Sequence, residues 1–436
     1  MRVVLISTYD LGRQPFGLAS PAAWLRAEGH DVTTADLSRE SAPFEAVRSA
    51  DWIAFHLPMH TATRLAVPQI KAARTLNPSA VICCYGLYAP VNEEMLRGLG
   101  VTHVIGGEFE RSLTDLVAGR TESSESIILD RLRFVTPDRS TLPLLGQYAG
   151  LRSAGERKVV GYTEASRGCK HGCRHCPIVP VYEGKFRVVQ REVVLTDVRQ
   201  QVAAGAQHIT FGDPDFLNGP GHAVAIIEAF RTEFPGVTYD VTIKVEHLLK
   251  HADVLPVLAR TGCLFITSAV ESVDDGVLAR LAKGHTRVDF VEALQLTRTH
   301  GLRMVPTFVA FTPWTTREGY LELLRAVRDL DLIESVAPIQ FAIRLLIPAG
   351  SKLLELDDLK TEAFDPAALS YRWRHPDPAM DSLCSDLQQI VRVADKRGQS
   401  REEVFRQIWE QAFGEFPDFH LVARSAIPYL TEPWYC

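Results

Sequence analysis

Short apolar runs alternate with amphipathic segments along residues 1–110. The runs whose length is typical of buried strands are 2–8, 31–35, 52–57, 81–85 and 103–105. Helical patterns such as 19–28 and 61–76 separate them, and Gly29 fits the C-cap of the first helix. Strands that alternate with helices in this way predict an α/β domain with a doubly wound parallel sheet over residues 1–133.

The same alternation resumes after a stretch without a sustained period. Residues 134–158 hold several prolines and glycines and predict a linker. The strands expected after it are 159–163, 208–211, 238–245, 264–269, 303–310 and 339–346. With the helical patterns between them they form six βα units, which predict a partial (β/α)6 TIM-type barrel over residues 159–356.

The last part of the chain, residues 357–436, is expected to be a small and mostly helical region. Its two long helical patterns cover 379–397 and 401–413. Active groups in barrels gather at the carboxyl ends of the strands, so those strand ends are the residues to inspect in the barrel.

Composition limits the function classes. The chain has 436 residues, of which 46% are hydrophobic and 23% charged, as in ordinary globular proteins. The net charge of −6 argues against a nucleic-acid partner, because such binding depends on a basic surface. No apolar run is long enough to span a membrane and no signal peptide is expected. Eight cysteines in so long a chain do not form a disulfide framework, so we expect a cytoplasmic protein with reduced thiols.

Three of those cysteines dominate the chemistry. Cys169, Cys173 and Cys176 follow the first expected barrel strand with CxxxCxxC spacing. Thiolates are the ligands that iron–sulfur clusters prefer, and three of them leave one iron of a [4Fe-4S] cluster open to chelate a substrate. Gly168 and Gly172 are expected to relieve crowding where the loop wraps the cluster.

A zinc site is the alternative for this loop. Zinc usually takes a fourth ligand at a recognisable spacing, and His171 or His175 could supply a nitrogen. A zinc-binding scaffold would give a colourless protein after anaerobic purification.

The cysteine spacing, its place at the start of the barrel and the patterns downstream resemble the radical S-adenosylmethionine (SAM) enzymes. The resemblance implies that the open iron binds the amino and carboxylate groups of SAM. It also implies an electron donor such as flavodoxin or ferredoxin and a small-molecule substrate. One position departs from the family, since His175 stands where an aromatic residue usually precedes the third cysteine.

The turn after the second barrel strand is expected to bind SAM. Gly212 would let the backbone approach the ligand, and Asp213 or Asp215 would accept from its ammonium group, as the acidic turn of the family does. The alternative is an Asx or proline turn that only connects strand to helix.

Further strand ends supply the other expected SAM contacts. Lys244 would meet the SAM carboxylate or form an ion pair with Asp213 or Glu271. Ser268 and Glu271 resemble a family turn that contacts the carboxylate or ribose, although Ser272 could also cap a helix there. Arg344, in a segment that resembles the PxGTxL pattern of cobalamin-type members, would clamp a carboxylate.

The amino-terminal domain resembles the cobalamin-binding domain that precedes many radical SAM modules. In parallel sheets, ligands lie beyond the carboxyl ends of the strands. The residues expected to contact cobalamin there are Tyr9, Gly17, Leu18, Met59, His60, Gly86 and Leu87. The DxHxxG motif that places a histidine on cobalt is missing, so cobalamin would bind without that ligand. A flavodoxin-like scaffold kept without its cofactor is the alternative, and a dinucleotide is disfavoured because no GxGxxG follows the first strand.

The carboxyl-terminal Cys436 is expected to be catalytic. With the amino-terminal domain, the end of the chain resembles a group of radical SAM proteins whose tails read Cys-Cys-Ala-Glu-Pro or Cys-selenocysteine-Ala-Glu-Pro. The sequence stops where the second cysteine or the selenocysteine would stand, so a UGA codon read as a stop is one hypothesis. A chance cysteine at a frayed terminus is the other.

Together these patterns predict reductive cleavage of SAM at a [4Fe-4S] cluster, followed by a cobalamin-dependent methyl or carbon transfer, or a radical rearrangement, on a small molecule. Transfer of the 3-amino-3-carboxypropyl group of SAM to a soft atom such as arsenic, without cobalamin, is one alternative. A non-catalytic iron–sulfur or cobalamin sensor is another.

Overall fold

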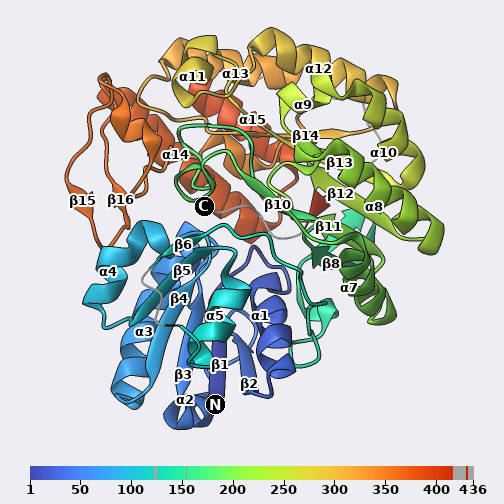
Figure 1. Ribbon diagram of the computed structural model, residues 1–436. Coiled ribbons are helices and arrows are strands. Elements are labelled where there is room, and N and C mark those ends of the chain that lie inside the picture. Colours follow the sequence, from blue (N-terminus) through green and yellow to red (C-terminus); the bar gives the residue numbers. More distant parts are fainter. Residues whose placement is uncertain (122–124, 154, 416–428, 431–436) are drawn as a thin grey trace.

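The computed structural model describes residues 1–121, 125–153, 155–415 and 429–430. Figure 1 shows an amino-terminal α/β domain below a curled sheet with outer helices, and a carboxyl-terminal pair of long helices against that sheet. The doubly wound domain, the partial barrel and the helical region therefore have the order that the sequence predicts.

The amino-terminal sheet is parallel throughout. Its strands are β1 (Arg2–Ser7), β2 (Asp31–Asp36), β3 (Trp52–His56), β4 (Val81–Tyr85), β5 (His103–Gly107) and β6 (Ile127–Ile128). They lie in the order β2-β1-β3-β4-β5-β6. The order reverses between β1 and β3, and in parallel sheets ligands bind at the carboxyl ends of the strands at such a point.

Helices cover both faces of this sheet, each over its own apolar core. One face carries α1 (Phe16–Ala27) and α5 (Phe109–Val117), packed around Leu5, Leu18 and Leu113. The other face carries α2 (Phe44–Ser49), α3 (His60–Leu76), the 3₁₀ turn η1 (Pro90–Asn92) and α4 (Glu93–Gly98). Because both faces are buried, the strands read as continuous apolar runs.

The barrel sheet has five parallel strands and an antiparallel edge. Its members are β7 (Gly150–Ser153), β8 (Glu156–Thr163), β11 (His208–Phe211), β12 (Thr238–Thr242), β13 (Cys263–Glu271), β14 (Met304–Phe308) and β17 (Tyr429–Leu430). The order is β14-β13-β12-β11-β8-β7-β17, with β7 and β17 antiparallel to their neighbours.

Helices and short elements complete this half. The helices beside the barrel strands are α7 (Arg191–Ala203), α8 (Pro220–Glu233), α9 (Val245–Lys250), α10 (Leu255–Thr261), α11 (Asp275–Leu281), α12 (Arg287–Thr299) and α13 (Arg317–Asp329). The cysteine loop lies between β9 (Ser166–Gly168) and α6 (Val179–Tyr182), and β10 (Phe186–Val188) pairs back onto β9. The 3₁₀ turns are η2 (Leu145–Gln147), η3 (Phe216–Asn218), η4 (Ala252–Val254), η5 (Pro338–Phe341) and η6 (Lys352–Glu355).

The carboxyl-terminal region closes the barrel. A small hairpin, β15 (Phe364–Asp365) and β16 (Ser370–Tyr371), precedes α14 (Pro378–Arg397) and α15 (Arg401–Phe413). Side chains such as Leu387 and Phe405 join the barrel core, so these helices cover the open side that five parallel strands leave.

The sixth expected barrel strand, 339–346, does not form. Its first residues are the 3₁₀ turn η5, and a single bridge between Phe311 and Arg344 is its sheet pairing in the described chain. Pro338 favours the helical start, and the side chain of Gln340 accepts the Phe308 N–H at 2.7 Å that a neighbouring strand would have used.

The stretch expected to be a linker, 134–158, contains ordered structure. It holds η2, β7 and the first residues of β8, and the β7–β8 hairpin extends the barrel sheet. Arg139 in this stretch donates two hydrogen bonds to Asp197 of α7, at 2.7 and 2.9 Å, and both side chains are buried. It also donates to Gln14 of the amino-terminal domain and to the Tyr162 carbonyl, so one guanidinium ties both domains together.

Among the described residues, no helix combines the length and apolarity needed to cross a membrane.

Loss of the Arg139 guanidinium is expected to destabilise the protein strongly. Arg139→Met leaves Asp197 buried and unpaired, which costs about 3–5 kcal/mol of unfolding free energy. The matched control Arg199→Met removes an exposed pair with Glu233, which is expected to cost at most about 1 kcal/mol. Urea denaturation followed by circular dichroism measures both, and equal losses would contradict the linking role of Arg139.

Candidate active site

The cysteine loop begins at a residue that must be glycine. Gly168 ends β9 with φ +74°, and a Cβ there would lie 2.4 Å from Tyr182 Cδ1 and 2.6 Å from the Lys185 carbonyl oxygen. A side chain at this point would push the loop away from α6. Gly172 differs, because a Cβ there meets nothing within 4 Å, so the expected relief of crowding applies to Gly168 alone.

Two side chains fix the loop on the barrel. Asn218 of η3 accepts from the Lys170 N–H at 3.1 Å and donates to the Gly168 carbonyl at 3.3 Å, on either side of Cys169. Arg174 donates to the Arg280 carbonyl at 3.0 Å, at the end of α11 where a cation is favourable. The loop is therefore held in shape by the protein itself.

The three loop cysteines are free thiols, which fits a cluster ligand set. Cys169 and Cys173 are buried and Cys176 is half-buried. Burial raises the pKa of Cys169, and it raises the pKa of Cys176 to about 12, with the neighbouring thiols acting in the same direction. Thiols that oppose one another's ionisation in this way are stabilised as thiolates by a shared metal centre.

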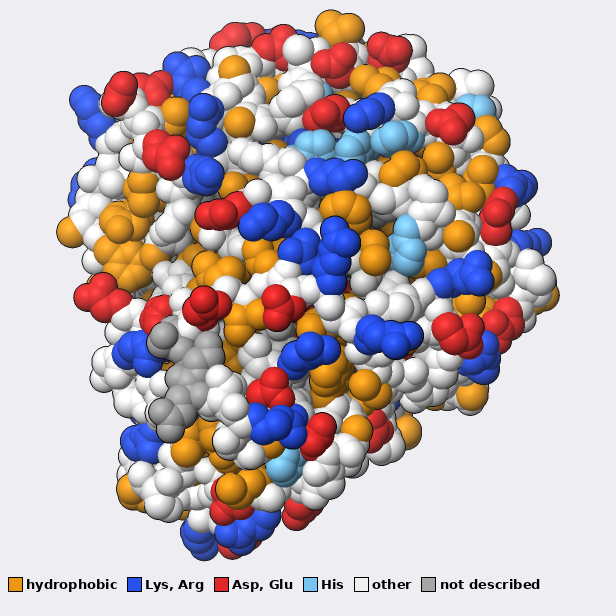
Figure 2. Space-filling view, in the orientation of Figure 1, with side chains coloured by type: hydrophobic (Ala, Val, Ile, Leu, Met, Phe, Trp, Pro, Cys, Tyr) orange, Lys and Arg blue, Asp and Glu red, His pale blue; other side chains and the backbone are white. Residues whose placement is uncertain are grey.

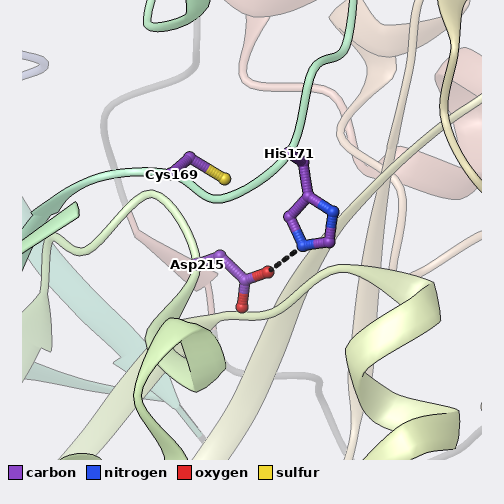
Figure 3. A group of neighbouring side chains, drawn as sticks. All are labelled: Cys169, His171 and Asp215. Carbon is purple, nitrogen blue, oxygen red and sulfur yellow. Dashed lines mark ion pairs between the residues drawn. The ribbon is translucent and has the colours of Figure 1, made fainter. Parts of the chain in front are cut away.

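A second group of ligand atoms lies beside Cys169. Its sulfur, a ring nitrogen of His171 and a carboxylate oxygen of Asp215 lie within 4.8 Å of one another (Figure 3). Asp215 Oδ2 is 3.4 Å from His171 Nε2 and 2.7 Å from His247 Nδ1. Burial would raise the pKa of Asp215, but the two imidazoles outweigh it and lower the pKa. Asp215 thus faces both imidazoles. Cys169, His171 and Asp215 could bind a single metal ion.

Asp213 and Gly212 serve the local structure in the described contacts. Asp213 accepts from the Ala165 N–H at 2.9 Å and from the Ser166 hydroxyl at 2.5 Å, so it fixes the strand that leads into the loop. Burial raises its pKa to about 7. A Cβ on Gly212 would lie 1.9 Å from the Tyr162 hydroxyl oxygen, so this glycine permits a close approach of protein rather than open space.

Glu271 stands at a strained position on the opposite side of the loop. It ends β13 at a register shift and has φ +70°, which is unfavourable for a residue with a side chain. Its Oε1 lies 3.2 Å from His175 Nε2 and 3.4 Å from Lys283 Nζ. Burial would raise its pKa, but Lys283 and His175 lower it to about 2. The unusual His175 therefore links the cysteine loop to β13.

Lys244 and Arg344 also have protein partners. Lys244 Nζ lies 3.6 Å from Cys173 Sγ and 3.7 Å from Glu246, so its ion-pair partner is neither of the two carboxylates expected from the sequence. Arg344 pairs with Asp381 at 2.6 Å and stacks on Trp373 in the carboxyl-terminal region. The described contacts bring Lys244 to the cysteine loop and place Arg344 with α14.

Several buried polar atoms of the barrel half have no aligned hydrogen-bonding partner among the described residues. They are Thr163 Oγ1, Ser268 Oγ, His175 Nδ1 and both ring nitrogens of His285, all buried, although the backbone of Val270 lies near the His285 ring. Burial and the ammonium groups of Lys283 and Lys244 lower the pKa of His285 to about 4, so its ring is neutral near pH 7. Buried polar atoms normally have partners, so these atoms are available to a polar ligand.

Of these residues, His285 and Lys283 were missed as site residues in the sequence. Both lie in the turn between α11 and α12, where spacing gives no sign that the chain returns to the loop.

On the exterior, histidine side chains lie in a row beside Lys and Arg side chains over the barrel half (Figure 2).

The edge of the amino-terminal sheet offers a second set of unused polar atoms. Ser7 Oγ, His56 Nδ1 and Glu108 Oε2 are buried at the ends of β1, β3 and just after β5, without an aligned hydrogen-bonding partner in the described chain. Glu108 Oε2 also lies 3.6 Å from the guanidinium of Arg167. The His56 ring fills the space where Gly17 lacks a side chain, and burial lowers its pKa to about 3.

The residues expected to contact cobalamin differ in their burial and in their contacts. Gly17 and Gly86 both border the His56 ring, and Gly86 has φ +108°. Leu18 of α1 is fully buried in the core, and His60 Nε2 donates to the Ala368 carbonyl at 2.6 Å. The remaining three, at the ends of β1, β3 and β4, are half-buried: Tyr9, Met59 and Leu87.

A buried arginine joins this edge to the cysteine loop. Arg167, two residues before Cys169, forms two hydrogen bonds with Glu110 of α5, at 2.6 and 2.9 Å. Its Nε donates to Glu164 at 2.6 Å. Tyr182 of α6 donates to Glu108 at 3.0 Å. The carboxyl ends of both sheets therefore face one another across the loop. Cys436 lies outside the described residues.

The Glu271 pair predicts a loss of stability in acid. A carboxyl with a folded pKa of about 2 and an ordinary value of 4.5 stabilises fully above pH 4.5, and this stabilisation falls as the pH drops toward 2. Between about pH 7 and about pH 4 the loss is about 1 kcal/mol. Glu271→Gln is expected to reduce the pH dependence by that amount, measured by urea denaturation of the cluster-free protein.

The exposed Glu318, which pairs with Arg325, provides the control for this measurement. Glu318→Gln is expected to keep the wild-type pH dependence. An equal reduction of the pH dependence in both variants would show that the pKa of Glu271 is not lowered in the folded protein.

Sequence comparison finds the Radical SAM superfamily over residues 163–327. A ribosomal protein uS12 methylthiotransferase of Porphyromonas gingivalis is 26% identical over 180 residues, covering 39% of this chain and 41% of that protein. A hopanoid C-3 methylase of Methylococcus capsulatus is 24% identical over 325 residues, covering 69% and 62%. The chain thus spans less than two thirds of these curated relatives.

Solved structures extend the likeness beyond the barrel. The cobalamin-dependent radical SAM enzyme OxsB, solved with aqua-cobalamin and SAM, has a TM-score of 0.70 at 14% identity, covering 90% of this chain and 66% of that one. The radical SAM methyltransferase TsrM from Kitasatospora setae, solved with cobalamin and a [4Fe-4S] cluster, has a TM-score of 0.59 at 17% identity, covering 76% and 70%. A radical SAM domain implies a [4Fe-4S] cluster and SAM. Residues 163–327 therefore form a radical SAM domain, within a chain that has the two-domain fold of the cobalamin-dependent radical SAM enzymes.

Proposed function

We propose that this protein reductively cleaves SAM at a [4Fe-4S] cluster and transfers a methyl or other carbon group to a small molecule with the help of cobalamin. The observation that carries the proposal is the free three-cysteine loop, held between the carboxyl ends of a barrel and of a second parallel sheet. The cluster supplies the electron for SAM cleavage, and cobalamin would supply a carrier for the methyl group.

The residues of the barrel would bind and orient SAM. Cys169, Cys173 and Cys176 would hold the cluster, with Asn218 and Arg174 keeping the loop in shape. The unused hydrogen-bonding atoms of Thr163, Ser268 and His285 would meet the polar groups of SAM. Asp213, Asp215 and Glu271 have protein partners, so as SAM contacts they would act through their remaining oxygen lone pairs.

The edge of the amino-terminal sheet would hold cobalamin. Its buried Ser7, His56 and Glu108 atoms without aligned partners give it hydrogen-bonding capacity, which supports a ligand there rather than an empty scaffold. Burial raises the pKa of Glu108 to about 7, so it can donate a hydrogen bond to an amide oxygen when protonated. The solved enzymes with the same two-domain arrangement bind cobalamin, which adds support by fold.

Product analysis after anaerobic reconstitution tests the proposal. The protein is loaded with iron and sulfide, reduced, and given SAM with and without added cobalamin. We expect 5′-deoxyadenosine together with S-adenosylhomocysteine, with the second product dependent on cobalamin. Cys173→Ser is expected to abolish both products and to lower iron well below about four per chain. The control Cys384→Ala changes a thiol on α14 and is expected to keep both.

Other outcomes would contradict the proposal in distinct ways. Methylthioadenosine would mean aminocarboxypropyl transfer instead. A full cluster without any SAM cleavage would favour a sensor, and a colourless protein with bound zinc would favour a scaffold.

A further inference from the structure

A buried ammonium group lies against one of the three loop thiols. Lys244 stands between β12 and α9, and its side chain is 8% exposed. Its Nζ lies 3.6 Å from Cys173 Sγ, within hydrogen-bonding distance for a sulfur acceptor. The geometry is that of an N–H donor directed at a thiolate.

The charge of Lys244 is only weakly compensated. Its acidic neighbour Glu246 is 3.7 Å away and 40% exposed, so water screens that pair. Glu246 also faces His171 Nδ1 at 3.3 Å, which divides its charge between two partners. The contact with Cys173 is buried, and charge interactions there are stronger than at the surface.

The other cations near the loop form their hydrogen bonds with groups other than the thiols. Lys283 donates to Glu271 at 3.4 Å, although its charge also acts on Cys173 and Cys176. Arg174 donates to the end of α11. Lys170 follows Cys169 directly, yet its ammonium lies over the ring of Phe186 at 4.8 Å and its side chain is exposed. Lys244 therefore has a position on the loop that these cations do not share.

We propose that Lys244 raises the reduction potential of the cluster held by this loop, acting through Cys173 as a positioning residue. The inference rests on the proposed function, because it requires a cluster on the three cysteines. One electron passes from an external reductant, a reduced flavin or iron–sulfur protein or dithionite, to the oxidised cluster. No bond forms or breaks.

The reason is electrostatic. Reduction adds one negative charge to a centre that is already negative, and an adjacent ammonium stabilises the added charge. Hydrogen bonds to the sulfurs and nearby charge are among the factors that set cluster potentials. Lys244 thus favours the reduced cluster, which is the form that donates the electron for SAM cleavage.

Potentiometric titration followed by electron paramagnetic resonance tests this without SAM and without turnover. Wild type, Lys244→Met, Lys244→Gln and Lys244→Arg are reconstituted anaerobically and their iron is counted. We expect Lys244→Met to keep its iron and to shift the midpoint to more negative potential. At a fixed potential the ratio of reduced to oxidised cluster should fall about tenfold, which corresponds to 59 mV for a one-electron couple.

The conservative variants separate charge from shape. Lys244→Arg keeps the charge, and its midpoint potential is expected to stay near the wild-type value. Lys244→Gln loses the charge, and its midpoint potential should become more negative, as in Lys244→Met. Lys170→Met is the matched control, since it removes an exposed ammonium from the same loop and should leave the midpoint unchanged.

Three results would overturn the inference. An unchanged midpoint in Lys244→Met and Lys244→Gln, with full iron, would show that the ammonium does not act on the cluster. Failure of both variants to assemble a cluster would assign Lys244 to assembly instead of tuning. A wild-type protein that holds no cluster would remove the proposed function as well, and the iron count distinguishes that case from the first.

Discussion

The relation between the two halves of the protein depends on the buried guanidinium of Arg167. Arg167 lies two residues before the first loop cysteine. It donates hydrogen bonds to Glu110 of the amino-terminal domain and to Glu164, which directly follows β8. The rings of Phe16, Phe109 and Phe134 surround it at 4.9 to 5.5 Å. A buried charge without partners is very costly, so the domains cannot separate without breaking this arrangement. The position of the cysteine loop is thereby tied to the sheet below it.

The two sides of this junction differ in charge. On the amino-terminal side, burial raises the pKa of Asp10 and of Glu108 to about 7. These carboxyls bind protons near neutral pH and can donate hydrogen bonds. On the barrel side, Lys244 and Lys283 place fixed positive charges near the thiols. A negative centre is therefore favoured at the loop, and the hydrogen-bond acceptors of a ligand are favoured at the sheet edge.

Most of the fold could be predicted from the sequence because buried parallel strands and amphipathic helices leave clear periods. The doubly wound sheet and the two long terminal helices follow from those periods alone. The prediction of a sixth barrel strand, 339–346, was wrong because Pro338 and the side chain of Gln340 replace strand pairing with a turn. The β7 strand within 134–158 was missed because an edge strand of four residues carries little pattern, whereas most of β8 was expected as 159–163.

The site was predictable as far as it is local in sequence. The three cysteines occur on one loop, so their spacing alone indicated a shared metal centre. The hydrogen-bonding partners of Asp213, Lys244 and Glu271 include residues 12 to 96 positions away, and spacing cannot reveal them. Sequence reasoning expected these strand ends to contact SAM, with an ion pair to Asp213 or Glu271 as the alternative for Lys244. In the structure each has a partner within the protein.

That difference has a physical reason. A buried charge is so costly without a partner that the charged groups around a site pair with one another when they can. A buried neutral hydroxyl or imidazole without a partner has a much smaller desolvation cost, so it can remain unpaired until a ligand binds. At this loop, Ser268 Oγ and the ring nitrogens of His285 lack aligned partners in the described chain, whereas the charged Glu271 is paired with Lys283. Unpaired neutral groups are therefore the better guide to where a polar ligand binds, and the paired charges set the electrostatic field in which it reacts.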